Sequence, residues 1–121
     1  MVARRRVAEA DGRAALSAWT SGTRERSVTA LAVRFCLEEI TARAPGNSVE
    51  VRVPPFGVTQ CIEGPRHTRG TPPNVVETDA ATWLGLVLGQ QEWAEAVAQG
   101  AVAASGTRTD LAELLPLFPA N

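Results

Sequence analysis

The chain has 121 residues, 45% of them hydrophobic, and a formal net charge of −1 at pH 7. This length suits one core and predicts a single domain over residues 1–121, while the apolar content argues against disorder. The near-neutral charge argues against a nucleic-acid binder, and no apolar run reaches the roughly 20 residues of a membrane span, so stable membrane insertion is not expected.

The N-terminus is basic, because residues 4–6 are all arginine. Such a terminal cluster is most often solvated, so residues 1–10 are expected to include a flexible basic end. It does not resemble a secretory signal, since Glu9 and Asp11 interrupt the apolar stretch that would have to follow. We therefore expect a cytoplasmic protein.

Two helices are predicted in the first third of the chain. Residues 11–19 have the apolar spacing of a short helix. Ser27 is a suitable N-cap for a longer amphipathic helix that stops near Ala44. Cys36 lies on the apolar face of this helix, which predicts a small core residue rather than a reactive thiol.

Strands follow the second helix. Residues 48–53 alternate strictly between valine and polar side chains, which predicts a half-buried strand. Pro54-Pro55 then predicts an irregular connection to a second strand over residues 56–64. Residues 74–78 and 101–105 are expected to form two more. The predicted fold class is α+β, with one mostly antiparallel sheet of four to five strands and N-terminal and C-terminal helices packed on it.

Residues 77–118 carry the most informative pattern. Gly89, Gly100 and Gly106 each follow an apolar run, as residues that end helices or strands do. The expected order is a helix around Trp83, a helix around Trp93, a short strand and a leucine-rich terminal helix. These signals concern apolar surface, with no catalytic apparatus among them.

The spacing of these motifs resembles the sterol carrier protein 2 superfamily, and most closely its small bacterial members, over residues 49–118. The residues that carry the resemblance are Thr78-Asp79, Gly89, Trp93-x-x-Ala96, Gly100-x-Val102-x-x-Ser105-Gly106 and Leu111-x-x-Leu114-Leu115. It implies non-enzymatic binding or transfer of an apolar ligand, such as a fatty acid, acyl thioester or isoprenoid. It also implies a cavity between helices and sheet, with the C-terminal apolar segment packed over it.

By this resemblance, the ligand is expected to contact large apolar side chains. They are Phe35, Phe56, Trp83, Leu86, Trp93, Val97, Leu111, Leu114, Leu115 and Phe118. The same residues would serve equally well as an ordinary packed core, because a hollow core and a filled one have the same sequence pattern. The sequence therefore leaves open whether the cavity exists.

One polar cluster suggests contact with a ligand's headgroup. Arg66, His67 and Arg69 lie in a loop rich in Gly and Pro, where the guanidinium groups could bind a carboxylate or phosphate. The alternative is a solvated loop whose arginines pair with nearby acidic residues. No nucleophile and base stand near His67 at a recognisable spacing, so a catalytic role for it would rest on one residue.

No catalytic residue, cofactor or metal site is predicted. Cys36 and Cys61 lack the spacing of metal ligands, and the chain is expected not to be an enzyme. The predicted partner is an apolar small molecule or lipid. The alternative function is a protein-interaction or accessory module with a closed core, acting as a homodimer or with a partner protein. It could be linked to mycothiol-dependent metabolism, since domains of this superfamily also occur attached to mycothiol-dependent isomerases.

Overall fold

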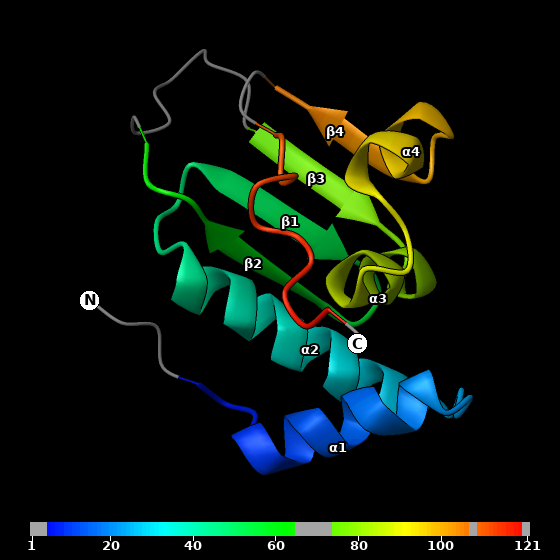
Figure 1. Ribbon diagram of the computed structural model, residues 1–121. Coiled ribbons are helices and arrows are strands. Elements are labelled where there is room, and N and C mark those ends of the chain that lie inside the picture. The colour runs from blue at the N-terminus through cyan, green and yellow to red at the C-terminus, as the bar shows by residue number, and fades with distance from the viewer. Residues whose placement is uncertain (1–4, 65–73, 107–108, 120–121) are drawn as a thin grey trace.

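A computed structural model describes residues 5–64, 74–106 and 109–119. The elements are, in chain order, α1 (Glu9–Thr20), α2 (Arg26–Arg43), β1 (Val49–Val53), β2 (Gly57–Cys61), β3 (Asn74–Thr78), α3 (Ala80–Leu88), α4 (Trp93–Ala98) and β4 (Val102–Ser105) (Figure 1). The predicted α+β class is confirmed. In the described part of the chain, no helix combines the length and the apolar character needed to cross a membrane.

The four strands form one sheet in the order β2-β1-β3-β4. β1 is antiparallel to β2 and β3 is antiparallel to β4, but β1 and β3 run parallel, so the sheet is mixed. Val51 lies opposite Thr59 on one side and Val76 on the other. Because β2 occupies one edge of β1, β3 pairs at the remaining edge.

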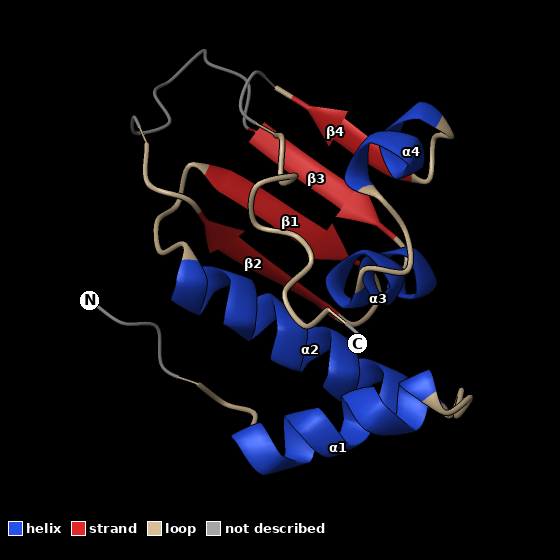
Figure 2. Cartoon of the chain, in the orientation of Figure 1, coloured by secondary structure: helices blue, strands red, loops and turns tan. Residues whose placement is uncertain are grey.

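Helices cover one face of the sheet, and α1 packs on α2 on the side away from the strands (Figure 2). In β1, Val49, Val51 and Val53 are buried while Arg52 is exposed. This alternation sends one set of side chains into the core and the other toward solvent, as the sequence pattern predicts. The outer side of β1 is therefore polar, and the core lies between the inner face of the sheet and the helices.

The two helices predicted in the first third of the chain and the helix predicted around Trp83 are present as α1, α2 and α3, with small shifts at their ends. The N-cap prediction for Ser27 is wrong, because α2 already begins at Arg26 and the N-cap position is Glu25. α3 has clear signals at both ends. The side chain of Asp79 accepts a hydrogen bond from the backbone N–H of Thr82, 2.7 Å away, and Gly89 ends the helix in a left-handed conformation with φ 78°.

The predicted leucine-rich terminal helix is not formed. Residues 112–114 make a turn, in which the N–H groups of Leu114 and Leu115 both donate to the carbonyl of Leu111. Pro116 and Pro119 follow, and neither has the N–H that a continuing helix requires. Residues 109–119 instead run as an irregular segment over the inner side of the sheet, which Figure 1 shows in red in front of the strands. We call this the C-terminal segment.

An ion-pair network fastens the start of the described chain to α2. Glu39 accepts hydrogen bonds from Arg5 Nη2 and from Arg43 Nε, each at 2.6 Å. Partial burial by itself would raise the pKa of Glu39, but the hydrogen bonds and charges of the two guanidinium groups outweigh it and lower the pKa below its usual 4.5. Because the folded-state pKa is lowered, the ionised carboxylate stabilises the fold above the unfolded pKa, and this contribution is lost as the pH falls through the folded one.

We therefore expect Glu39→Gln to be less stable than the natural protein at pH 7, and the difference to shrink below about pH 4.5. Urea unfolding from pH 7 to pH 3 measures this. Glu9→Gln is the control, since the Glu9–Arg13 pair is exposed and 3.3 Å long, and we expect little change there. A Glu39→Gln deficit that stays constant down to pH 3 would contradict the role of the carboxylate charge.

Candidate functional site

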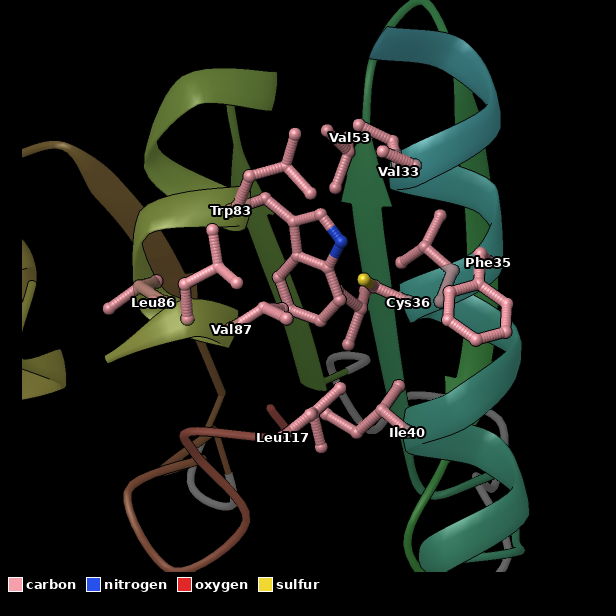
Figure 3. Packing of buried hydrophobic residues seen from close by; sticks show 14 of the residues in the cluster. Val33, Phe35, Cys36, Ile40, Val53, Trp83, Leu86, Val87 and Leu117 are labelled. Atoms are coloured by element: carbon pink, nitrogen blue, oxygen red, sulfur yellow. The ribbon is translucent and has the colours of Figure 1, made fainter. Parts of the chain in front are cut away.

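An apolar layer between α2, α3 and the sheet is the centre of the molecule. Trp83 of α3 reaches toward α2, where Cys36 lies beside its ring, and Leu117 from the C-terminal segment meets Ile40 of α2 (Figure 3). All of these side chains are buried. Residues that are far apart in the chain thus form one layer. The sequence alone could not show that they lie side by side.

The residues predicted to contact a ligand occupy three kinds of position. Phe35, Trp83, Leu86 and Leu111 are at most 1% exposed and belong to the packed core. Phe56, Trp93, Leu114, Leu115 and Phe118 are partly buried against it. Val97 is 39% exposed on α4. The headgroup candidates Arg66, His67 and Arg69 lie outside the described residues.

Side chains rather than the backbone hold the C-terminal segment in place. Within the described residues, its one backbone hydrogen bond to another part of the chain runs from Phe118 N to Val87 O, at 2.9 Å. Leu111 and Leu117 are buried, and Leu114, Leu115 and Phe118 cover the edge of the core. The segment therefore covers the core chiefly through apolar contacts, which do not depend on direction as hydrogen bonds do.

Phe118 has a cationic and aromatic surrounding that the sequence did not suggest. Its ring stacks on Phe35, with centroids 5.6 Å apart and planes inclined by 9°. The guanidinium carbons of Arg13 and Arg43 lie 5.2 Å and 5.1 Å from the ring centroid. A depression of about 270 Å³ opens beside Phe118, between α1 and the end of α3. The sequence signal for the close packing around Phe35 was Gly12, a glycine within a predicted helix, because a Cβ there would lie 2.2 Å from the Phe35 ring.

Trp83 carries a buried donor without an acceptor. Among the described residues, no hydrogen-bond partner lies within reach of its Nε1. An unsatisfied buried donor costs about 1–3 kcal/mol, so its presence at the centre of the core calls for an explanation. Figure 3 shows the ring nitrogen pointing toward α2.

The thiols in the core are not arranged for catalysis or metal binding. Burial raises the pKa of Cys36 to about 12 and that of Cys61 to about 11, so both are protonated at neutral pH. Across residues 5–64, 74–106 and 109–119, no group of three or more His, Cys, Asp or Glu side chains is placed to hold a metal ion. The described core therefore offers apolar surface and one buried donor without a partner, the Nε1–H of Trp83.

Comparison with known families identifies the chain. Residues 25–117 match the family model described as bacterial SCP ortholog, which is more than half of the chain. The protein belongs to this family. The predicted resemblance to bacterial sterol carrier proteins is thus confirmed, and no curated protein matches the chain. The match takes in α2, the sheet, α3, α4 and most of the C-terminal segment, and leaves α1 outside. Membership of this sterol carrier family indicates a lipid-binding carrier role in general terms.

Proposed function

We propose that this protein binds or transfers an apolar ligand between α2, α3 and the sheet, beneath the C-terminal segment, without catalysing a reaction. The observation that carries the proposal is how that segment is attached. One backbone hydrogen bond and a set of apolar side chains hold it over the core in the described residues. An apolar ligand could take over such contacts, because hydrophobic burial requires no particular geometry.

Burial of an acyl chain can offset the free energy lost when side chains of the C-terminal segment are displaced. Full burial of a Leu or Phe side chain is worth about 1.5–3 kcal/mol, and partial burial less. Displacing the half-buried Leu114, Leu115 and Phe118 would therefore cost about 3–5 kcal/mol. An acyl chain of about ten methylene groups contributes about 8 kcal/mol when buried, which exceeds that cost.

The unpartnered N–H of Trp83 favours a ligand that has an oxygen acceptor. A fatty acid or an acyl thioester has a carbonyl oxygen that could accept this hydrogen bond, whereas an isoprenoid hydrocarbon has none. We therefore rank acyl compounds first among the ligands that the sterol carrier resemblance implies.

The alternative is an accessory or protein-interaction module with a closed core. It is favoured by the dense packing of Phe35, Trp83, Leu86 and Leu111, each at most 1% exposed. In this case the same residues act only as core, and function depends on a partner protein or a second copy of the chain.

Ligand titration separates these two functions. Protein purified without detergent is examined by native mass spectrometry for retained lipid and then titrated with a fluorescent fatty acid. The carrier function predicts a saturable 1:1 complex. At a ligand concentration 100 times Kd it predicts a stabilisation of about 2.7 kcal/mol, which raises Tm by about 10 °C. No complex and no shift in Tm with fatty acids, acyl thioesters and isoprenoids would refute the carrier function and favour the module.

A further inference from the structure

A concave site lies outside the apolar layer. It is a groove of about 430 Å³ on the flank of α2, bounded by residues 5–7 on one side and by residues 56–59 on the other. α2 contributes Arg34, Leu37, Glu38 and Thr41 to it. Their spacing of three, four and seven residues places them on one face of the helix. Of the side chains predicted to contact a ligand, Phe56 is the one that lines this groove.

The groove has more free cationic donors than acceptors. Arg34 donates through Nε to the carbonyl of Phe56, 2.8 Å away, and among the described residues its two Nη atoms have no partner. In the same part of the chain the guanidinium of Arg6 is likewise without one, whereas Arg5 is paired with Glu39. The acidic residue of the groove, Glu38, already accepts from the backbone N–H groups of Arg6 and Val7. An anionic oxygen is the natural complement to this arrangement.

The edge of the sheet adds one more donor. β2 is an edge strand, and α2 caps two outward carbonyls along this edge. Arg34 donates to Phe56 O, just before β2, and Thr41 Oγ1 donates to Gln60 O at 2.7 Å. Alternate residues of a strand direct their backbone groups to the same edge, so Val58, which lies midway and lines the groove, points both its N–H and its C=O there. The donors along this wall are thus the Arg34 guanidinium and the Val58 amide.

The groove also has apolar surface. Val7 and Leu37 are buried beneath it and Phe56 is half-buried at its rim. Gly57 keeps this part open, because a Cβ at that position would lie 3.0 Å from Leu37 Cδ1 and extend into the same space. The volume falls within the range of about 300–1,000 Å³ that is typical of small-molecule sites.

We propose that this groove binds a small anionic amphiphile, with its carboxylate or phosphate held by Arg6 and Arg34 and its short apolar part resting on Val7, Leu37 and Phe56. This site is separate from the apolar layer and does not depend on the function proposed above. Charge complementarity favours an anionic ligand over a neutral one of the same length.

The test uses four eight-carbon probes at concentrations below micelle formation: octanoate, octyl phosphate, octanol and octyltrimethylammonium. Amide chemical shifts in ¹⁵N-labelled full-length protein report where each one binds. Octanoate and octyl phosphate are expected to shift residues 56–59 and 34–41 in a saturable manner. Octanol is expected to bind about tenfold more weakly and the cation not at all, because a charge-assisted hydrogen bond would be lost. The ratio of octanoate to octyl phosphate affinity shows which head the groove prefers.

Arg6→Gln should weaken binding of both anions about tenfold, as a charge-assisted hydrogen bond predicts, without changing stability, since its guanidinium has no partner in the described residues. Arg34→Gln should weaken anion binding at least as much. This variant also loses the hydrogen bond to the carbonyl of Phe56. Arg52→Gln on the outer face of the sheet is the matched control and should leave binding unchanged.

Four results would overturn the proposal. Equal affinity for octanol and octanoate would remove the role of the arginines, as would unchanged binding in Arg6→Gln. Shifts confined to residues 83–87 and 111–118 would place the anions in the apolar layer, so that the carrier function would stand while the groove site fell. Binding of an acidic peptide at residues 56–59, with no effect of octanoate or octyl phosphate, would instead make the groove a protein-docking surface.

Discussion

Phe118→Ser is expected to weaken fatty-acid binding by more than it lowers the free energy of unfolding. The ring is half-buried and stacks on Phe35, so its loss should cost the free protein about 1–2 kcal/mol. If the C-terminal segment lies over a bound ligand, the same substitution also removes contacts with that ligand, and we expect Kd to rise at least tenfold, equivalent to about 1.4 kcal/mol. Urea unfolding and titration with a fluorescent fatty acid, performed on the same sample, measure the two quantities.

Two further variants, one at a buried residue and one at an exposed residue, serve as comparisons for Phe118→Ser. Leu117→Ala removes a buried side chain and should cost about 2–5 kcal/mol of stability. The family resemblance implied that Val97 contacts the ligand, but it is 39% exposed on α4. Val97→Ser should therefore alter neither stability nor binding. If Phe118→Ser loses stability as expected but Kd is unchanged, the segment does not contact the ligand, and Phe118 serves only to pack against Phe35.

Local patterns predicted most of the secondary structure because those elements depend on neighbours in sequence. The alternating valines of β1 and the Asp79 and Gly89 signals of α3 each act within a few residues. The parallel pairing of β1 with β3 was not predictable in this way, since it depends on which edge of β1 remains free. The terminal helix was mispredicted because Leu111, Leu114 and Leu115 have helical spacing.

For the candidate sites, too, local sequence predicted some features, and contacts between distant residues decided the others. Of the ten apolar residues selected by type, Phe35, Trp83, Leu86 and Leu111 are buried in the core. Packing density decides whether such residues surround a ligand, and packing depends on residues distant in sequence. The groove is formed by residues that are far apart in the sequence. Arg34 and Phe56 lie in different parts of the chain. The sequence placed Arg6 in a solvated terminus, whereas its backbone N–H donates to the carboxylate of Glu38. No local motif contains that information.

Gly12→Ala is expected to destabilise the protein by about 2–3 kcal/mol, although replacing glycine by alanine within a helix ordinarily stabilises by up to about 1 kcal/mol. A Cβ at Gly12 would lie 2.2 Å from two atoms of the Phe35 ring, which is far closer than van der Waals contact. The ring cannot easily move away, because its stack with Phe118 confines it. Steric overlap therefore outweighs helix propensity at this position.

Gly85→Ala in α3 is the matched control. There a Cβ would meet only the side chain of Gln91, at 3.6 Å or more, so we expect a neutral or slightly stabilising effect. Urea unfolding at 25 °C compares the two variants, and Gly12→Ala combined with Phe35→Leu tests the cause, since the smaller side chain should make the Gly12 substitution less costly. The comparison also bears on the proposed ligand site, because Phe35 pushed toward Phe118 would disturb the cover of the apolar layer. If both alanine variants were equally stabilised, α1 would not press on Phe35, and the link from α1 through Phe35 to the C-terminal segment would have to be abandoned.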